Sequence, residues 1–402
     1  PPSRESSIGR IVIDSSTRTS MTRSMSSHYS QSPVVQSESA PKREVRRLLR
    51  IAANCPGRLT EMGLPELDMA LRVIRRARLM GRVAHQLDEA GLTGRLPQVA
   101  VDQLAAASAM ANARVRLARW ELDRIAWAMG KDLSTPLVLM KGCAYEALSL
   151  PRMTGRIFAD VDLMTSESAL GKVENVLNSY GWMTASLSPY DDNYYRRWTH
   201  ELPPMTHVER EVEIDLHHNF VPRTSRLKPN AQLILERCRE LPDSRYQVLA
   251  EEDLALHAMV HLMFDSDLGD KLRDLVDIAD LVTAFSAGNP GFWSTLEARA
   301  RELGLERPAF YSLRYVKRLL ETDVPNEVVE HLARWAPPAP VLKLMDRLVD
   351  EALFPQHPDN PGRAASVARL LLYVRSHWLR MSPWLLAYHL ANKFVRKRIL
   401  RR

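Results

Sequence analysis

Two short segments in which acidic and apolar residues alternate place the strongest constraint on the fold of this 402-residue chain. They are residues 157–164 and 208–216, and a period of two is typical of a β-strand with one buried face. Elsewhere apolar residues recur at helical spacing, as in Leu67, Leu71 and Ile74. Strands set among many helices predict a small mixed sheet in a largely helical chain, which is an α+β fold.

The order of these patterns predicts four regions. Residues 1–42 are rich in Ser, Thr and Arg and poor in apolar side chains, so we expect a disordered tail. Residues 43–134 have helical spacing and carry no catalytic pattern. The strand-like runs fall within residues 135–222, which we expect to form a mixed α/β core. Residues 223–402 return to helical spacing and are predicted to form a C-terminal helical domain.

Composition narrows the class of protein. The chain is 45% hydrophobic and 26% charged, as an ordinary globular protein is, and its net charge of +7 indicates either an affinity for polyanions or a general preference for arginine. Cys55, Cys143 and Cys238 lie far apart without CxxC spacing, so we predict neither a disulfide framework nor a zinc site, and a reducing compartment fits best. No run of about 18 apolar residues is present, so we expect no transmembrane span and a cytoplasmic location.

Asp160 and Asp162 are the first candidate site residues. Alternate side chains of a strand lie on one face, so both carboxylates project together while Val161 and Leu163 point into the core. Like charges side by side repel each other, and a divalent cation that prefers hard oxygen ligands removes the repulsion. This Asp-x-Asp pattern is weak evidence alone, because solvated strand edges carry such pairs too.

A third acid strengthens the prediction. Glu213, Asp215 and His217 share one face of the second acidic strand, and Ile214 and Leu216 share the other. If the two strands are neighbours, Asp215 completes a three-carboxylate site for two Mg²⁺ or Mn²⁺ ions, with Glu213 as the alternative ligand. Such a site aligns an attacking hydroxyl with the α-phosphate of an NTP and stabilises the leaving pyrophosphate.

The order of these features resembles the polymerase-β-like nucleotidyltransferase superfamily, in which a Gly-containing turn, an Asp-x-Asp strand and a later acidic strand follow one another. From about Arg43 onward the chain is similar to a nucleotidyltransferase family often found in bacterial exopolysaccharide and peptide-tailoring gene clusters. The motifs that carry this resemblance are Leu139-Met-Lys141-Gly142, Arg156, Asp160-Val-Asp162-Leu163, Glu213-Ile-Asp215-Leu-His217, His257-x-x-x-His261 and Leu272-Arg-Asp-Leu-Val-Asp-Ile278. The resemblance implies that Asp160, Asp162 and Asp215 are catalytic metal ligands and that the Lys141-Gly142 turn lies against a triphosphate.

This turn departs from the superfamily in one respect. Gly-Gly or Gly-Ser is usual there, whereas Cys143 follows Gly142 here, so no hydroxyl stands next to the glycine to contact phosphate. Lys141 either compensates by its charge or is a solvated turn lysine, and the helix that follows offers free N–H groups to an anion. We expect Gly142 to provide the conformational freedom of the turn. Arg156 either pairs with the strand's acids or contacts phosphate.

Histidines and aromatic residues are weaker candidates. We expect His217 to orient Asp215 or to contact the substrate, and His218 to be structural. His257 and His261 have a helical spacing that can hold zinc, but they lack the HExxH pattern, so we interpret them as packing residues. The aromatic and basic residues 190–198 are interpreted as a loop that either stacks a base or is a partly buried connector.

Three functions remain open from the sequence. The first is metal-dependent transfer of an NMP from an NTP to a hydroxyl or phosphate of a small molecule, glycan precursor or peptide. The second is a glycosyltransferase that holds a nucleotide sugar through Asp-x-Asp, against which the third acid and the glycine turn argue. The third is a non-catalytic adaptor on a degenerate core, which the atypical turn favours. Nucleic acid is not an expected partner, because no recognisable nucleic-acid-binding module accompanies the core.

Overall fold

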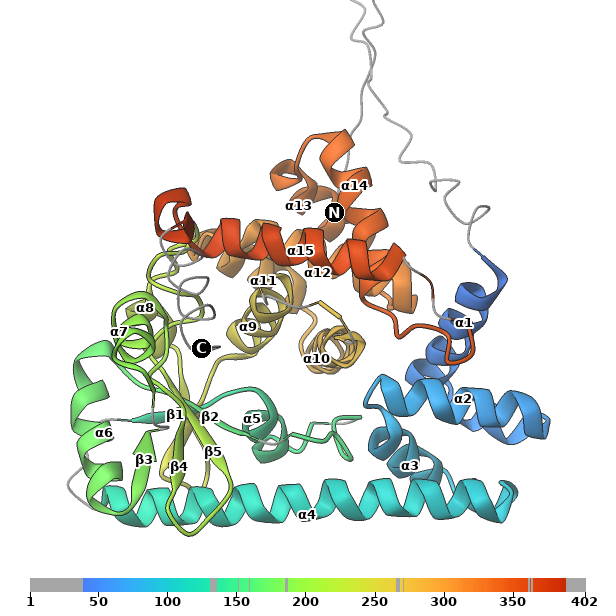
Figure 1. The fold of residues 1–402 in the computed structure, drawn as a ribbon, viewed down its shortest axis with the longest axis horizontal. Coiled ribbons are helices and arrows are strands. Elements are labelled where there is room, and N and C mark those ends of the chain that lie inside the picture. The colour runs from blue at the N-terminus through green and yellow to red at the C-terminus, as the bar shows by residue number, and fades with distance from the viewer. Residues whose placement is uncertain are drawn as a thin grey trace, which may run out of the picture. The chain divides into compact units, whose positions relative to one another are not determined.

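The computed structural model describes residues 39–130, 136–150, 152–158, 160–184, 187–264, 268–269, 271–360, 362 and 364–387. Residues 1–38 of the tail predicted at residues 1–42 lie outside the described residues, and the first helix begins at Ala40. The contacts separate residues 1–39 from residues 40–402, and the helices and strands of the described chain belong to the second unit (Figure 1).

Seven strands in the described chain form one mixed sheet: β1 (Leu137–Leu139), β2 (Asp160–Met164), β3 (Trp182–Thr184), β4 (Met205–His207), β5 (Glu213–His217), β6 (Arg239–Glu240) and β7 (Tyr246–Val248). Their order across the sheet is β3-β4-β5-β2-β1-β7-β6. The central strand β2 runs parallel to β5 and antiparallel to β1, and β1 runs parallel to β7. This sheet, set among helices, confirms the α+β class.

The strand boundaries differ from the expected ones. The strand expected over residues 157–164 begins at Asp160, and β4 was not expected. The predicted strand at 208–216 begins only at Glu213, because residues 208–212 form the connection between the antiparallel strands β4 and β5. β6 and β7 follow residue 222, where we predicted helices alone. These strands are two and three residues long, which is too short for a period of two to appear in the sequence.

Helices cover the rest of the unit: α1 (Ala40–Asn54), α2 (Leu64–Arg76), α3 (Met80–Glu89), α4 (Gln98–Met129), α5 (Lys141–Ala147), α6 (Leu170–Ser179), α7 (Pro189–Trp198), α8 (Ala231–Leu235), α9 (Glu251–Phe264), α10 (Leu272–Gly288), α11 (Phe292–Glu302), α12 (Glu306–Leu320), α13 (Asn326–Leu332), α14 (Ala339–Ala352) and α15 (Ala364–Arg380). None of the helices in the described ranges combines the length and apolar character that a membrane crossing needs. The basic residues at the extreme C-terminus lie outside the described chain.

The longest of these helices, α4, ties the N-terminal helices to the sheet. Its 32 residues are rich in Ala, Leu and Arg, and it ends at Gly130, whose φ is +62°. At about 1.5 Å per residue such a helix spans roughly 48 Å. It contacts α3 at one end and α6 and β2 at the other, and Figure 1 shows it running beneath both groups.

Residues 190–198 form α7 and not the loop that we predicted. Ser188 caps the helix by accepting a hydrogen bond from the Asp191 N–H at 3.1 Å, and a proline occupies the first turn. Tyr190, Tyr194 and Trp198 recur every four residues, and their rings meet edge to face at centroid distances of 6.3 Å and 5.7 Å. These three rings therefore contact one another within the helix.

A buried ion pair holds α3 against α10. The guanidinium of Arg82 donates to both carboxylate oxygens of Asp280, at 2.9 and 3.0 Å, and to the carbonyl oxygen of Ala53 at 3.0 Å. Both partners are about 5% exposed. Because a buried charge without its partner is costly, this bidentate pair restricts how the N-terminal helices sit on the C-terminal ones.

Two glycines make the closest backbone contact between α3 and the segment before β2. A Cβ atom built on Gly81 would lie 2.3 Å from the carbonyl oxygen of Gly155, and one built on Gly155 would lie 2.3 Å from that of Gly81. Gly155 also has a φ of +82°. This approach brings the first turn of α3 against the segment that leads into β2.

We expect Gly81→Ala to destabilise the fold, since the new methyl group would overlap a backbone oxygen and such overpacking costs about 1–3 kcal/mol. Gly171→Ala is the matched control, because Gly171 is likewise the second residue of a ten-residue helix and faces open space. The control should gain up to roughly 1 kcal/mol from helix propensity. Urea denaturation compares the two, and equal stability would disprove the contact.

Candidate active site

The register between β2 and β5 decides which acids meet. The strands are parallel, and Asp160 lies beside Glu213 while Asp162 lies beside Asp215. Val161 and Ile214, which point to the other side, are fully buried. The predicted neighbouring strands therefore exist, and their alternation turns the acidic side chains to one face.

Asp162 is the most constrained of these acids. Its side chain is 3% exposed, and its Oδ1 accepts hydrogen bonds from Lys141 Nζ at 2.5 Å and His217 Nε2 at 3.1 Å. Burial alone would disfavour the carboxylate, but the charges of Lys141 and His217 outweigh it and hold the pKa of Asp162 well below its usual range. The same pairing raises the pKa of Lys141 despite its burial. Asp162 is therefore a fixed negative charge.

The pKa of Asp215 is shifted in the opposite direction to that of Asp162. Burial raises the pKa of Asp215 to about 7, and the neighbouring Asp162 carboxylate contributes to that rise. One ligand atom each from Asp162, Asp215 and His217 lie within 4.8 Å of one another. Asp160 is half-buried on the same strand face but does not belong to that group. The structure thus brings Asp162 and Asp215 together directly, whereas Asp160 lies two residues before Asp162 on the same face of β2.

The donor set fits a divalent cation with oxygen ligands. Lys141 supplies one positive charge for two adjacent carboxylates. The pKa of Asp215 is raised because burial and the negative charge of Asp162 both disfavour its ionised form. A cation between them would replace the proton. Asp162 and Asp215 offer carboxylate oxygens close together, and Asp160 lies on the same face of β2. Glu213, our alternative ligand, is exposed and lies opposite Asp160.

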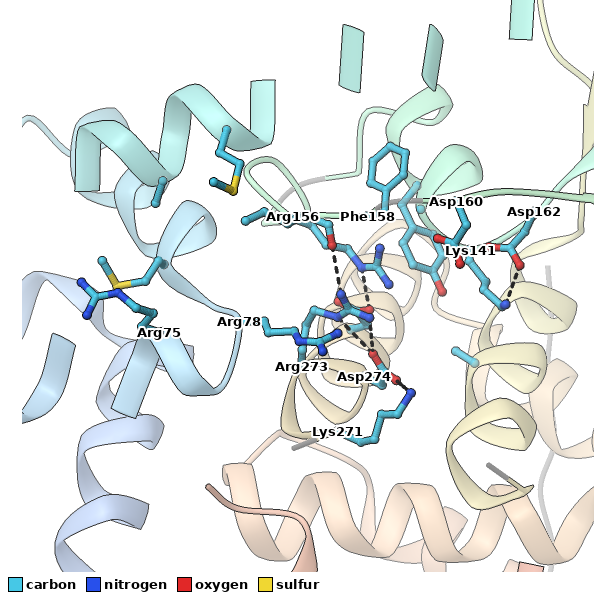
Figure 2. A pocket seen from close by; sticks show the side chains of 18 of the residues that line it. Arg75, Arg78, Lys141, Arg156, Phe158, Asp160, Asp162, Lys271, Arg273 and Asp274 are labelled. Atoms are coloured by element: carbon cyan, nitrogen blue, oxygen red, sulfur yellow. Dashed lines mark hydrogen bonds and ion pairs between the residues drawn. The ribbon is translucent and has the colours of Figure 1, made fainter. Parts of the chain in front are cut away.

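A pocket of about 730 Å³ opens beside these acids (Figure 2). It contains both Asp160 and Asp162 in its wall, whereas Asp215 is not one of its lining residues. The other polar or aromatic lining residues are Arg75, Arg78, Gln103, Lys141, Tyr145, Arg156, Phe158, His261, Lys271, Arg273, Asp274 and Asp277. Its volume is within the range of small-molecule sites, and cations outnumber acids in its wall.

The Lys141-Gly142 turn is built differently from our expectation. Lys141, and not Gly142, takes the left-handed conformation, with a φ of +44°. Gly142 is required for space, because a Cβ atom there would lie 2.7 Å from Phe158 Cγ and 3.0 Å from Arg156 Nη1. The glycine therefore lets the segment before β2 pack against the first turn of α5.

Arg156 is held on the pocket wall by α10. Its Nε donates to Asp277 Oδ2 at 2.7 Å, and its guanidinium lies 5.5 Å from the centroid of the Tyr145 ring. Arg273 donates to the carbonyl oxygen of Ile157 at 2.9 Å and to Asp274. Of the two roles predicted for Arg156, pairing occurs with an acid of α10 and not with those of β2.

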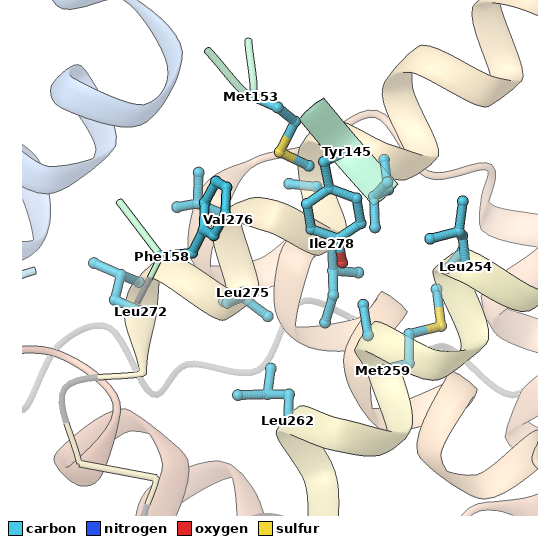
Figure 3. Packing of buried hydrophobic residues seen from close by; sticks show 14 of the residues in the cluster. Tyr145, Met153, Phe158, Leu254, Met259, Leu262, Leu272, Leu275, Val276 and Ile278 are labelled. Carbon is cyan, nitrogen blue, oxygen red and sulfur yellow. The ribbon is translucent and has the colours of Figure 1, made fainter. Parts of the chain in front are cut away.

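Apolar packing fixes the position of this wall. Tyr145, Met153 and Phe158 are buried and pack toward α9 and α10, where Leu262 and Val276 lie (Figure 3). Fully burying a side chain of this size contributes about 1.5–3 kcal/mol. The cations of the pocket are thus carried by elements that the core holds in place.

The N-terminal helices contribute lining residues that the sequence did not reveal. Arg75 near the end of α2 and Arg78 just after that helix face the pocket from the side opposite the acids (Figure 2). Gln103 of α4 also lines the pocket. Arg75 donates a hydrogen bond to Gln103. No spacing in residues 43–134 marks these side chains, because only the folded chain brings them toward β2.

Three further histidines singled out in the sequence, His218, His257 and His261, have different surroundings in the structure. His257 is buried against Phe220 at a centroid distance of 4.9 Å, as expected of a packing residue, and His261 lines the pocket. His218 accepts a hydrogen bond from Arg223 at 3.2 Å. The residues of α7 are absent from the pocket wall, so the aromatic stretch does not contribute to it.

Comparison with known proteins adds one finding. A family model described as an uncharacterised nucleotidyltransferase matches residues 65–321, which is more than half of the chain. The match includes α2 through α12, and with them the pocket and both acidic strands. No curated protein and no solved structure matches the chain.

We expect Lys141→Met to destabilise the protein by about 3 kcal/mol, since it leaves a buried carboxylate without its cation. Lys141→Met combined with Asp162→Asn should cost less than the sum of the two single changes, because both charges are then absent. Arg72→Met, which removes the cation from the exposed pair with Asp359, is the control and should change stability little. Additive losses in urea denaturation would contradict the pairing.

Proposed function

We propose that this chain, which belongs to the uncharacterised nucleotidyltransferase family, transfers an NMP from an NTP to a hydroxyl or phosphate of an acceptor in a metal-dependent reaction. The single observation that carries the proposal is the register of β2 and β5, which sets Asp162 beside Asp215 next to a pocket rich in cations. The acceptor classes are a small molecule, a glycan precursor or a peptide.

Asp160, Asp162 and Asp215 are proposed as the ligands of Mg²⁺ or Mn²⁺. Hard cations prefer carboxylate oxygens together with phosphate oxygens, and the paired acids of β2 and β5 offer the first half of that set. When bound, the metal supplies charge neutralisation at the transferred phosphoryl group and its leaving group.

The pocket's cations are proposed to bind the triphosphate. Lys141 lies against Asp162 in the pocket wall, and Arg156 is paired there with Asp277. Lys271 and Arg273 add positive charge at the start of α10. Helix α5 has seven residues, so its N-terminus adds little, and side-chain charge is the larger contribution. Asp274 and Asp277 neutralise part of this charge and keep the guanidinium groups in position.

The proposed reaction forms one bond to the α-phosphorus of the NTP and breaks another. An acceptor oxygen forms a bond to the α-phosphorus of the NTP, the bond between that phosphorus and the bridging oxygen breaks, and pyrophosphate leaves. When the acceptor is a hydroxyl, one of the three carboxylates takes its proton. Arg156 and Lys141 stabilise the negative charge that moves onto the leaving pyrophosphate.

Asp162→Asn and Asp215→Asn should each lower the transfer rate by roughly a hundredfold or more, since metal sites supply several kcal/mol of charge stabilisation. The assay incubates the protein with Mg²⁺, NTPs labelled at the α-phosphate and an extract of its source cells, and follows labelled acceptor and released pyrophosphate. Asp359→Asn is the control, because Asp359 is an exposed acid paired with Arg72 and lies outside the pocket.

The outcomes separate the three functions. Pyrophosphate release that requires Asp162 and Asp215 supports nucleotidyl transfer. Release of a nucleoside diphosphate from a nucleotide sugar would identify a glycosyltransferase. A protein whose melting temperature does not change with any NTP and Mg²⁺ would be a non-catalytic adaptor. Label transfer that persists unchanged in both variants would overturn the assignment of the acids.

Gly142→Ala tests the pocket wall separately from the acids. Its methyl group would displace Phe158 or the guanidinium of Arg156, and a shift of about 1 Å in a positioning group can cost up to roughly a hundredfold in kcat/KM. Gly171→Ala, at the second residue of α6, faces open space and should leave kcat/KM unchanged. Equal constants for the two variants would exclude Arg156 and Phe158 from substrate positioning.

A further inference from the structure

A short segment next to the acids is paired to the end of β5. The Leu202 N–H donates to the Leu216 carbonyl oxygen at 2.9 Å, and the His218 N–H donates to the His200 carbonyl oxygen at 2.8 Å. Between these bonds Glu201 and His217 form an antiparallel bridge. Directly opposite residues of such a pair lie close together, so the backbone itself places Glu201 beside His217.

Three side chains that commonly bind metals converge there. One ligand atom each of His200, Glu201 and His217 lie within 4.8 Å of one another. His217 Nδ1 is 3.3 Å from Glu201 Oε2, His200 Nε2 is 3.9 Å from the same oxygen, and the two imidazole centroids are 5.3 Å apart. None of the three lines the large pocket.

The ring nitrogens of this cluster are poorly satisfied. Nδ1 of His217 and Nδ1 of His200 are buried and have no hydrogen-bond partner in the described chain, and His217 is 1% exposed. The 3.3 Å approach to Glu201 lacks the alignment of a hydrogen bond. An unsatisfied buried polar atom costs about 1–3 kcal/mol, so an ion that accepts the lone pair of His217 Nδ1 would relieve that cost. His200 faces Glu201 with its Nε2, so only His217 offers an unsatisfied nitrogen to the ion.

We propose that His200, Glu201 and His217 bind one divalent transition ion of the Zn²⁺ class. At metal–ligand distances near 2.0–2.2 Å, neighbouring ligands of a tetrahedral ion lie roughly 3.3–3.5 Å apart. The separation of 3.3 Å between His217 Nδ1 and Glu201 Oε2 already meets that value, and His200 needs a small movement. Two imidazoles and one carboxylate favour Zn²⁺ over Mg²⁺, which prefers oxygen.

The second ring nitrogen of His217 completes the arrangement. Its Nε2 lies 3.1 Å from Asp162 Oδ1, and a metal-binding histidine usually donates its other N–H to a carboxylate in this way. Asp162 would thereby orient His217, while Lys141 holds the same oxygen from the other side. His200 and Glu201 are 16% and 26% exposed, which leaves the ion a path from solvent.

This site goes beyond the proposed nucleotidyl transfer, because its three ligands differ from Asp160, Asp162 and Asp215. A competing state has a protonated His217 paired with Asp162 and Glu201 and no metal. The two states differ in a measurable way, since only the first takes up an ion stoichiometrically.

The full chain is stripped with a chelator, mixed with Zn²⁺ in the presence of a large excess of Mg²⁺, and passed through a desalting column before its metal content is measured. We expect about one Zn²⁺ per chain in the native protein, and an affinity at least roughly tenfold weaker in His200→Ala and in Glu201→Gln. His331→Ala is the matched control, because His331 also lies 3.1 Å from a glutamate, Glu297, but on the exposed surface. It should bind Zn²⁺ as the native protein does.

A spectroscopic measurement on the native protein does not depend on any variant folding. Co²⁺ added in place of Zn²⁺ should give the visible absorption of an ion with nitrogen and oxygen ligands, and His200→Ala should abolish it. Asp162→Asn should lose nucleotidyl transfer yet keep the Co²⁺ absorption, with an affinity roughly 10- to 100-fold lower. The absence of stoichiometric Zn²⁺, or binding that is equal in His200→Ala, would overturn the site and leave the proposed transfer untouched.

Discussion

The parallel pairing of β2 with β5 is the constraint on which the rest of this structure depends. It sets Asp162 beside Asp215 in strands whose other faces are fully buried, so the two carboxylates cannot separate without disrupting the core. Adjacent acids in a partly buried place are unstable unless cations surround them. In the folded chain Lys141 supplies a positive charge beside Asp162, His217 donates a hydrogen bond to the same carboxylate, and a bound metal would add further positive charge.

Around that pair, two further buried acids have partners from a different part of the chain. Arg156 before β2 pairs with Asp277 of α10, and Arg82 of α3 pairs with Asp280 three residues further along the same helix. Helix α10 therefore carries acids that hold both the pocket wall and the N-terminal helices. Because breaking such a pair is costly, the pairs specify how the helices meet even where they contribute little net stability.

Much of the sheet was predictable from sequence because its signals are local. Alternating acidic and apolar residues marked β2 and β5, and Lys141-Gly142 marked the start of α5. Strands β6 and β7 were missed because a few residues show no period, and α7 was taken for a loop although Ser188 and Pro189 mark its start. Arg78 and Gln103 carried no signal, since their proximity to the acids exists only after α2 and α4 have packed.

By itself, the sequence determined which faces of the strands and helices are buried, since strand alternation and helical spacing follow from the backbone. It also indicated Asp160, Asp162 and Asp215 as candidate metal ligands. Tertiary structure decided the rest. It showed that Asp162 and Asp215 are the opposed pair, that Lys141 takes the left-handed turn while Gly142 makes room for Phe158, and that His200 and Glu201 stand beside His217. These facts depend on contacts between residues far apart in the chain, and no local pattern encodes such contacts.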